Sequence, residues 1–433
     1  MVKLKVKVPK SCTSITINII AVSVYAVSLY FLRQKGIKPF WGAIISIASL
    51  AATIVLLEKS FLKDRHSRSS GIDFAIPGRL DIKRVLVKLL GLYFTIALVA
   101  FFYWLFPEYN TGMYDYYFEL VYYILPILLV GSIPYFFILD KYMREPRDSH
   151  WHVGMLILGR WKKIDKRILK NHFLGWLVKA FFLALMFPPL MHNTDILMKK
   201  TFTESLSQFP KFYDYTYTFI FSVDLVFVCS GYLLTLKIFD SHIRTVEPSF
   251  LGWIVAIQCY QPFWSFSHQH YLGYDDNLFW GHIFTKSKIL YSSYGMIILS
   301  LLAIYSFASV SFGLRFSNLT NRGIITNGPY RYLKHPAYIS KNLAWWMISV
   351  PFLSSVSWEK AVQHSLLLLI LNFIYYLRAI TEERHLSLDP IYVQYATALN
   401  EKGLFSALYK VFPFMKYNVN RYIENGKIKK ILF

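Results

Sequence analysis

The sequence predicts an all-α, polytopic transmembrane protein with about ten spans and with both termini in the cytoplasm. Hydrophobic residues make up 55% of the 433 residues, and apolar windows of roughly 20 residues recur along almost the whole chain. Cations also gather in alternate connections between these windows. A helix of about 20 apolar residues crosses a bilayer, where only helices and closed barrels satisfy every backbone polar group.

Each apolar window predicts one span. The first window follows a basic segment, as a signal peptide would, but it lacks a small-residue cleavage pattern and is expected to be retained. The window 250–266 is the weakest, because it is short and contains Pro262, which also permits a re-entrant segment. In chain order the expected spans are 13–32, 40–58, 85–106, 117–139, 174–192, 217–237, 250–266, 289–311, 338–356 and 362–379.

The distribution of positive charge indicates the topology. The net charge is +22, and Lys and Arg dominate the connections 59–84, 140–170 and 312–337, which fall on one side of a ten-span chain. The positive-inside tendency makes that side cytoplasmic, although the connections 33–39 and 238–249 deviate from it. The same side carries the N-terminal lysines Lys3, Lys5, Lys7 and Lys10. The charge therefore predicts topology and contact with anionic lipids, and it does not indicate nucleic-acid binding.

Neither a metal site nor a disulfide framework is indicated. His268 and His270 lie near the acidic pair Asp275 and Asp276, but two histidines two residues apart on a predicted outside loop are weak evidence for a metal. The three cysteines are isolated along the chain: Cys12, Cys229 and Cys259. No metal and no disulfide is therefore predicted.

The chain divides at about residue 285. Residues 1–285 contain seven expected spans, and residues 286–433 contain three spans that lie close together. The link 354–362 is so short that the last two spans must be antiparallel neighbours. Both open ends of this hairpin then face the cytoplasm, one with "GPYRYLKHPAY" and the other with "LRAITEERHLSLDPIYVQYATAL".

The first of these segments suits an anionic ligand. Pro336 disfavours the α conformation for His335 and suits the first helical position, so His335 is expected at the start of a helix. Unpaired backbone N–H groups gather at such a start, and Arg331 and Lys334 add positive charge. Hydroxyl groups and ring faces are offered by Tyr330, Tyr332 and Tyr338.

The second segment supplies the complementary charge. Glu382 and Glu383 follow the last span directly and could hold an amine or another cationic centre. Each residue also has a simpler explanation. Glu382 could pair with Arg378 one turn earlier for about 0.3–0.5 kcal/mol, the cations could only mark topology, and His335 could only cap its helix. Together, the two segments predict a site for a ligand that carries both a carboxylate and a positive charge.

The combined pattern resembles that of the integral-membrane methyltransferases, which include the isoprenylcysteine carboxyl methyltransferases and the phospholipid N-methyltransferases. Their pattern reads Gly-Pro-Tyr-Arg, then Arg-His-Pro-x-Tyr, and after one hairpin Glu-Glu with a downstream Tyr-x-x-Tyr. The resemblance covers about residues 286–415. Lys334 departs from the family's Arg, and Asp389-Pro390 replaces a Gly of many relatives. The matching positions are Gly328, Pro329, Tyr330, Arg331, His335, Pro336, Tyr338, Glu382, Glu383, Tyr392 and Tyr395.

The resemblance implies S-adenosylmethionine as the methyl donor, bound by the matching positions at the cytosolic mouth of the C-terminal helices. By analogy, His335, Tyr338 and the backbone of 328–331 would hold the methionine part and the ribose, and Glu382 and Glu383 would complete the pocket. These two carboxylates and His335 are the candidate catalytic bases. An ammonium acceptor would need such a base, whereas a carboxylate or thiolate would need none.

The acceptor is expected to be a lipid or a lipidated, isoprenylcysteine-like molecule that arrives from the bilayer. The membrane would be a bacterial inner membrane or the endoplasmic reticulum. Two other functions fit the same sequence. Sterol reductases, which use NADPH, have a similar C-terminal architecture, although the motif fits methyl transfer better. A transporter or scaffold would show charges buried within spans, and Asp224 is one such residue.

Overall fold

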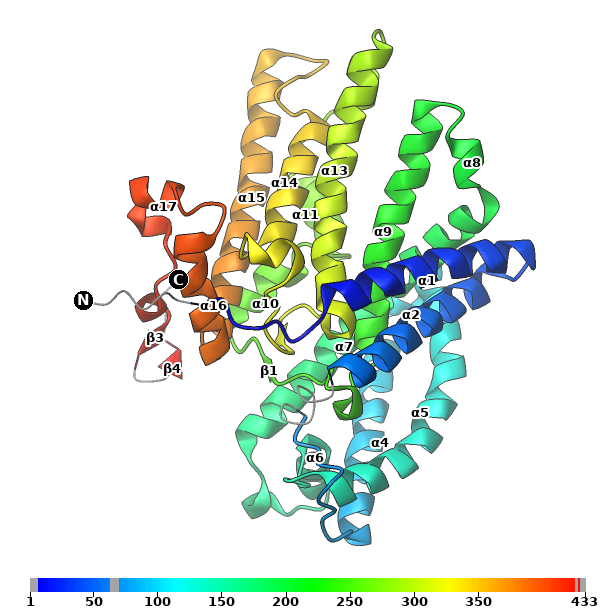
Figure 1. Ribbon diagram of the computed structural model, residues 1–433, viewed down its shortest axis with the longest axis vertical. Helices are drawn as coiled ribbons and strands as arrows, with labels where there is room; N and C mark the ends of the chain where they lie inside the picture. The colour runs from blue at the N-terminus through cyan, green and yellow to red at the C-terminus, as the bar shows by residue number, and fades with distance from the viewer. Residues whose placement is uncertain (1–6, 63–69, 425–426, 429–433) are drawn as a thin grey trace.

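The computed structural model describes residues 7–62, 70–424 and 427–428 of the chain. The predicted cationic positions Lys3 and Lys5 lie outside these residues. The described chain is largely helical (Figure 1). Its longer helices are α1 (Ile15–Gln34), α2 (Pro39–Phe61), α4 (Ile82–Leu105), α5 (Asp115–Tyr142), α7 (Lys166–Lys199), α9 (Phe209–Leu233), α13 (Lys288–Phe312), α14 (Pro336–Ser349), α15 (Trp358–Leu386) and α16 (Pro390–Lys402).

Short elements connect these helices. The short α-helices are α6 (Ser149–Ile157), α8 (Phe202–Ser205), α10 (Phe250–Ile257), α11 (Phe263–His270), α12 (Trp280–Ile283) and α17 (Leu408–Val411). The strands β1 (Thr245–Val246) and β2 (Thr320–Asn321) form one antiparallel pair, and β3 (Ile423–Glu424) and β4 (Lys427–Ile428) form another. A 3-10 turn, η6 (Gly328–Arg331), precedes α14.

Eight of the ten predicted spans are helices long and apolar enough to cross a membrane, within the part of the chain that the structure describes. The all-α, polytopic fold class is therefore confirmed. These helices correspond to the predictions 13–32, 40–58, 85–106, 117–139, 174–192, 217–237, 289–311 and 362–379.

The other two predicted spans differ from single long helices. The window 250–266 forms α10 and α11, which are separated by residues 258–262; Pro262 lacks the N–H that would continue a helix through this segment. The window 338–356 forms α14, which has 14 residues and ends at Ser349. Val350 then takes a left-handed conformation ahead of Pro351, where a helix readily stops. At 1.5 Å per residue, α14 is about 21 Å long, shorter than a typical hydrocarbon core.

The hairpin predicted between the last two expected spans, 338–356 and 362–379, is present as α14 and α15 (Figure 1). Polar side chains join the two helices near their middle. The indole N–H of Trp346 donates to Asn372 at 2.7 Å, and the amide of Asn372 donates to Asn342 at 2.6 Å. These bonds hold the hairpin in register, so that the start of α14 lies beside the end of α15.

Contacts also join the N-terminal and C-terminal parts of the chain. The side chains of Thr13 and Asn18 donate to the carbonyls of Ser311 and Val310, each at 2.7 Å. The strand pair β1–β2 links Thr245 with the neighbourhood of Asn321 across the predicted division at residue 285. One hydrophobic cluster contains buried residues of α1, α2, α7, α9 and α13, among them Ile17, Leu50, Leu190, Phe227 and Val310.

Candidate active site

His335 lies at the position that the sequence predicts, immediately before α14. It is the N-cap residue of this helix, and Pro336 occupies the first helical position. Its ring stacks on that of Tyr338 at 5.5 Å between centroids. His335 therefore stands where the turn η6 passes into α14, at the open end of the hairpin.

The two adjacent carboxylates at the end of α15 have different surroundings. Glu383 is buried, and its oxygens lie 2.6 Å from Lys334 Nζ and 3.1 Å from His335 Nε2. The hydroxyl of Tyr422 donates to the same carboxylate at 3.1 Å. Glu383 is thus fully engaged in joining α15 to the start of α14 and to the C-terminal segment.

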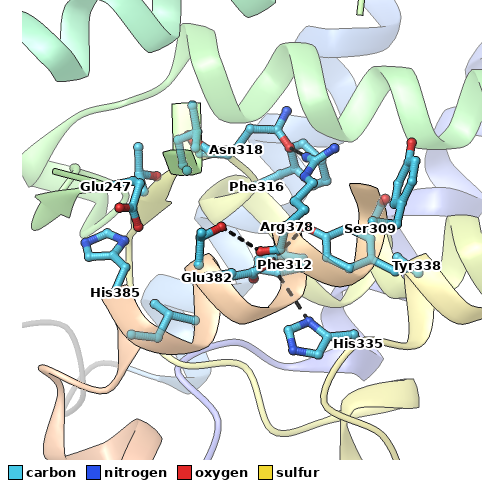
Figure 2. A pocket seen from close by; sticks show the side chains of 18 of the residues that line it. Glu247, Ser309, Phe312, Phe316, Asn318, His335, Tyr338, Arg378, Glu382 and His385 are labelled. Carbon is cyan, nitrogen blue, oxygen red and sulfur yellow. Dashed lines mark hydrogen bonds and ion pairs between the residues drawn. The ribbon is translucent and has the colours of Figure 1, made fainter. Parts of the chain in front are cut away.

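Glu382 keeps 38% of its side chain exposed and faces a cavity. It accepts a hydrogen bond of 2.7 Å from the hydroxyl of Tyr338, and its Oε2 lies 3.9 Å from His335 Nδ1 (Figure 2). A carboxylate held in this way retains lone pairs for a ligand. Of the two predicted acids, Glu382 is the one that lines the cavity.

The cavity has a volume of about 110 Å³, several times the 10–15 Å³ or so that one water requires. It lies between η6, α14 and α15 on one side and the β1–β2 region on the other. In Figure 2, Glu247 and His385 lie toward one end and Arg378 and Tyr338 toward the other, with Glu382 between them. The wall combines ionisable groups with aromatic rings, among them Tyr260, Tyr330 and Tyr375.

Arg378 is a buried guanidinium that lines this cavity. It donates to the amide oxygen of Asn318 at 2.6 Å and lies 5.1 Å from the centroid of the Tyr338 ring. Two more rings, those of Tyr260 and Tyr375, lie within 5.8 Å of it. Among the described residues, no carboxylate forms an ion pair with Arg378, so the simpler alternative, in which Glu382 only pairs with Arg378, does not hold.

Two buried polar atoms on the cavity wall have no hydrogen-bond partner in the described structure. They are Oε2 of Glu247 and Oγ1 of Thr320. The other oxygen of Glu247 is held by Arg384 at 3.3 Å. Buried polar groups normally find partners, so these two atoms indicate that a ligand or water completes the site.

The predicted site residues separate into two groups. Tyr330, His335, Tyr338 and Glu382 line the cavity. The remaining predicted residues lie outside the lining: Gly328, Pro329, Arg331, Pro336, Glu383, Tyr392 and Tyr395. Arg331 is exposed.

Tyr395 has a structural contact instead. Its hydroxyl donates to the carbonyl oxygens of Tyr330 and Leu333 at 2.6 and 3.1 Å, and burial raises its pKa far above the usual value. Tyr392 packs against Tyr395, with ring centroids 5.9 Å apart. Tyr395, with Tyr392 packed against it, therefore fixes the loop that carries Tyr330.

The motif comparison did not identify several residues of the cavity wall. Arg378 and His385 lie one helical turn before and after Glu382, so their shared helix face was a usable signal. Glu247, Asn318 and Tyr260 come from loops and short elements, and their approach depends on tertiary contacts that no sequence spacing reveals. The hydroxyl of Thr245, which does not itself line the cavity, lies 2.9 Å from His385 Nε2 and holds that ring in place.

A second cavity of about 470 Å³ adjoins the first and shares five lining residues with it. The shared residues are Tyr260, Tyr305, Phe316, Asn318 and Lys341. The rest of its wall comes from α7 and α9, including Pro189, His192, Phe221 and Asp224. The N-terminal spans thus enclose a space directly beside Arg378 and Asn318.

Comparisons with known proteins find a family match for part of the chain. Neither the curated proteins nor the solved structures give a match. A family match covers residues 294–388, from α13 to just beyond the end of α15. This region carries His335, Tyr338, Arg378 and Glu382, and the resemblance predicted from the motifs is confirmed there. Residues 294–388 match the isoprenylcysteine carboxyl methyltransferase (ICMT) family.

Proposed function

We propose that the protein is an integral-membrane methyltransferase that uses S-adenosylmethionine to methylate a lipid or a lipidated, isoprenylcysteine-like acceptor at the cytosolic face of the membrane. The observation that carries the proposal is the cavity at the open end of the α14–α15 hairpin. It combines the accessible carboxylate of Glu382 with the guanidinium of Arg378, which pairs with no carboxylate among the described residues, inside the region that matches the methyltransferase family. The family's name describes methyl transfer to the carboxyl group of an isoprenylcysteine.

The lining residues suit the chemical groups of S-adenosylmethionine, which carries a carboxylate, an ammonium, a sulfonium and an adenine ring. Arg378 suits the carboxylate, because charge-assisted bonds from guanidinium to carboxylate are strong. Glu382 and the free oxygen of Glu247 suit the ammonium and the ribose hydroxyls. The rings of Tyr338 and Tyr375 offer π faces to a cation or a flat ring.

The residues contribute binding and alignment. When bound, S-adenosylmethionine supplies a methyl group on a positively charged sulfur. Tyr338 fixes the orientation of Glu382, whose negative charge balances a cationic guest. Positioning alone accelerates a displacement reaction strongly. His335 lines the cavity, and its imidazole can accept a proton from an ammonium acceptor, whereas a carboxylate acceptor requires no base.

The acceptor binds, by our proposal, in the adjoining cavity of about 470 Å³. Its volume falls within the range of roughly 300–1,000 Å³ that is common for small-molecule sites. Lys341 lies at the junction of the two cavities, where its ammonium sits 5.1 Å from the centroid of the Tyr305 ring and 5.0 Å from that of Trp345. A cation at this junction suits an acceptor carboxylate, and the proposal gives the N-terminal spans the task of holding the acceptor.

Equilibrium binding of labelled S-adenosylmethionine to the full chain in lipid nanodiscs tests this function. Saturable binding that is lost in Glu382→Gln and His335→Ala is expected. Matched controls on exposed positions, Glu359→Gln of α15 and His270→Ala, should bind as the wild type does. Saturable binding of labelled NADPH together with no signal for S-adenosylmethionine would contradict the proposal.

A further inference from the structure

A third cavity lies away from the candidate active site. Its volume is about 650 Å³, and it shares no lining residue with the other two cavities described above. Its wall is formed by the end of α5, the start of α6, the first turns of α7 and the loop that follows α9. All of these residues precede the region 294–388, so the family match does not concern this cavity.

The wall of this cavity is strongly cationic. Two acids, Glu145 and Asp148, face five cations. Asp148 is already engaged, because its carboxylate accepts hydrogen bonds from the first backbone N–H groups of α6. The cations are Arg144, Arg147, Lys179, Lys237 and Arg244. Positive charge is therefore in excess where the cavity is enclosed by protein.

Lys179 and Lys237 are the partly buried cations of this wall without an acidic partner among the described residues. Arg147 also lacks one but is exposed, and Arg244 lies 3.8 Å from Asp240. Among the described residues, neither lysine forms an ion pair, whereas Arg144 lies 3.1 Å from Asp73. Lys179 instead lies 3.5 Å from the centroid of the Trp176 ring. Both lysine side chains are partly buried. A partly buried ammonium group without a counter-ion favours an anionic ligand.

Neutral imidazoles complete the wall. Burial, reinforced by nearby lysines, lowers the pKa of His150 to about 3 and that of His242 to about 4. Both are therefore uncharged at neutral pH and can donate one hydrogen bond each. Nδ1 of His242 is buried and has no hydrogen-bond partner among the described residues. Such donors suit the oxygens of a phosphate.

The cavity lies at the ends of membrane-spanning helices. α5 ends at Tyr142 and α7 begins at Lys166, and both ends belong to the connection whose charge predicts the cytoplasmic side. A phosphate at this level is presented by the headgroup of a lipid in that leaflet. We propose that this cavity binds the phosphate of an anionic phospholipid headgroup, a site separate from the methyl-transfer site.

Thermal unfolding of the full chain in detergent tests this site. Titration with short-chain phosphatidate should raise the melting temperature saturably, and the same concentrations of phosphatidylcholine or of inorganic phosphate should not. In Lys179→Gln/Lys237→Gln the apparent affinity for phosphatidate should fall about 30-fold, since each cation contributes about 1 kcal/mol and 1.4 kcal/mol is tenfold. Lys179→Arg/Lys237→Arg, which keeps both charges, should retain binding.

The matched control is Lys162→Gln/Lys163→Gln, which removes two exposed charges from the same connection. Its affinity for phosphatidate should equal that of the wild type. An equal loss in this control would mean diffuse attraction to a basic surface and would overturn the proposal. Equal stabilisation by inorganic phosphate, or no saturable effect of phosphatidate, would overturn it too. None of these results bears on the binding of S-adenosylmethionine.

Discussion

At the scale of single residues, two adjacent glutamates have different roles, one in the cavity and one in a buried ion-pair cluster. Glu382 and Glu383 are neighbours in the sequence, but consecutive helix residues point about 100° apart. Glu382 faces the cavity and Tyr338, whereas Glu383 is enclosed by Lys334, His335 and Tyr422. Lys334, which departs from the family's Arg, therefore serves the buried contact with Glu383 and does not line the cavity.

This division predicts that the same substitution at the two positions affects different properties, stability at Glu383 and ligand binding at Glu382. Glu383→Gln should lower the free energy of unfolding by roughly 3–5 kcal/mol, because it leaves the Lys334 ammonium without its buried partner. Glu382→Gln should change stability by less than about 0.5 kcal/mol and weaken binding of S-adenosylmethionine by at least about tenfold. Chemical denaturation and ligand binding measure the two effects. The same response from both variants would contradict the division.

A second residue-scale prediction concerns pH. Burial beside Lys237, Arg244 and Arg322 lowers the pKa of His242 to about 4, although Asp240 opposes the shift, whereas an unfolded histidine titrates near 6.5. The unfolded state thus binds more protons between these pH values, and the free energy of unfolding should fall as the pH drops from 6.5 to 4.

The pH dependence is measured by denaturation at several pH values. His242→Gln, which cannot gain this charge, should show a shallower slope than the wild type over that window. His270→Gln, at an exposed position, should keep the wild-type slope. Identical slopes for His242→Gln and the wild type would show that His242 does not contribute.

At the scale of elements, the turn η6 determines where the cavity residues lie. Gly328 has φ of +54°, and a Cβ there would overlap Ser311 Oγ of α13. The close approach allows η6 to pack against α13 while Tyr330 lines the cavity. The bonds from Tyr395 to the carbonyls of Tyr330 and Leu333 fix the other side of this turn.

Gly328→Ala should therefore destabilise the protein and also weaken binding of S-adenosylmethionine. A matched control is Gly36→Ala, which has φ of +61° but no atom within 4 Å of the added Cβ. The control should lose only the roughly 1–2 kcal/mol cost of the left-handed conformation. Gly328→Ala should lose more, as measured by denaturation. Equal losses in the two variants would contradict a packing requirement at η6.

The elements also show how far the sequence predicts the structure. Long apolar windows predicted eight helices, because a span is encoded by local composition. The short link near residues 354–362 predicted the hairpin, and with it the meeting of His335 with Glu382 and Glu383. The two windows that did not form one long helix each contain a proline, Pro262 or Pro351, whose effect on the helix outweighs apolarity.

At the scale of the whole molecule, the candidate site is shared between the two parts of the chain. Glu247, Tyr260 and Asn318 reach the cavity through the β1–β2 region and α10, and no local pattern marks them. Their contribution depends on packing between segments that are far apart in the sequence. The motif therefore predicted the C-terminal half of the cavity wall, and tertiary contacts determine the rest.

Because the proposed acceptor cavity adjoins the proposed donor cavity, a substitution at Lys341, where the two meet, should change the KM for the acceptor more than the affinity for S-adenosylmethionine. Lys341→Met should raise the KM for N-acetyl-S-farnesylcysteine, a minimal isoprenylcysteine, by about tenfold or more, because a charge-assisted contact to the acceptor carboxylate is lost. Affinity for S-adenosylmethionine should change much less. Lys360→Met, at an exposed position of α15, is the matched control and should leave both values unchanged. A loss confined to S-adenosylmethionine would place Lys341 in the donor site instead.

The most direct measurement of the central claim is transfer of a labelled methyl group. The full chain in proteoliposomes is incubated with methyl-labelled S-adenosylmethionine and N-acetyl-S-farnesylcysteine, and the product is treated with base, which releases methanol from a methyl ester. We predict base-labile label in the acceptor with the wild type and with Glu359→Gln, and at least tenfold less with Glu382→Gln. Wild-type protein that binds both compounds and transfers no label to this acceptor or to membrane lipids would contradict the account.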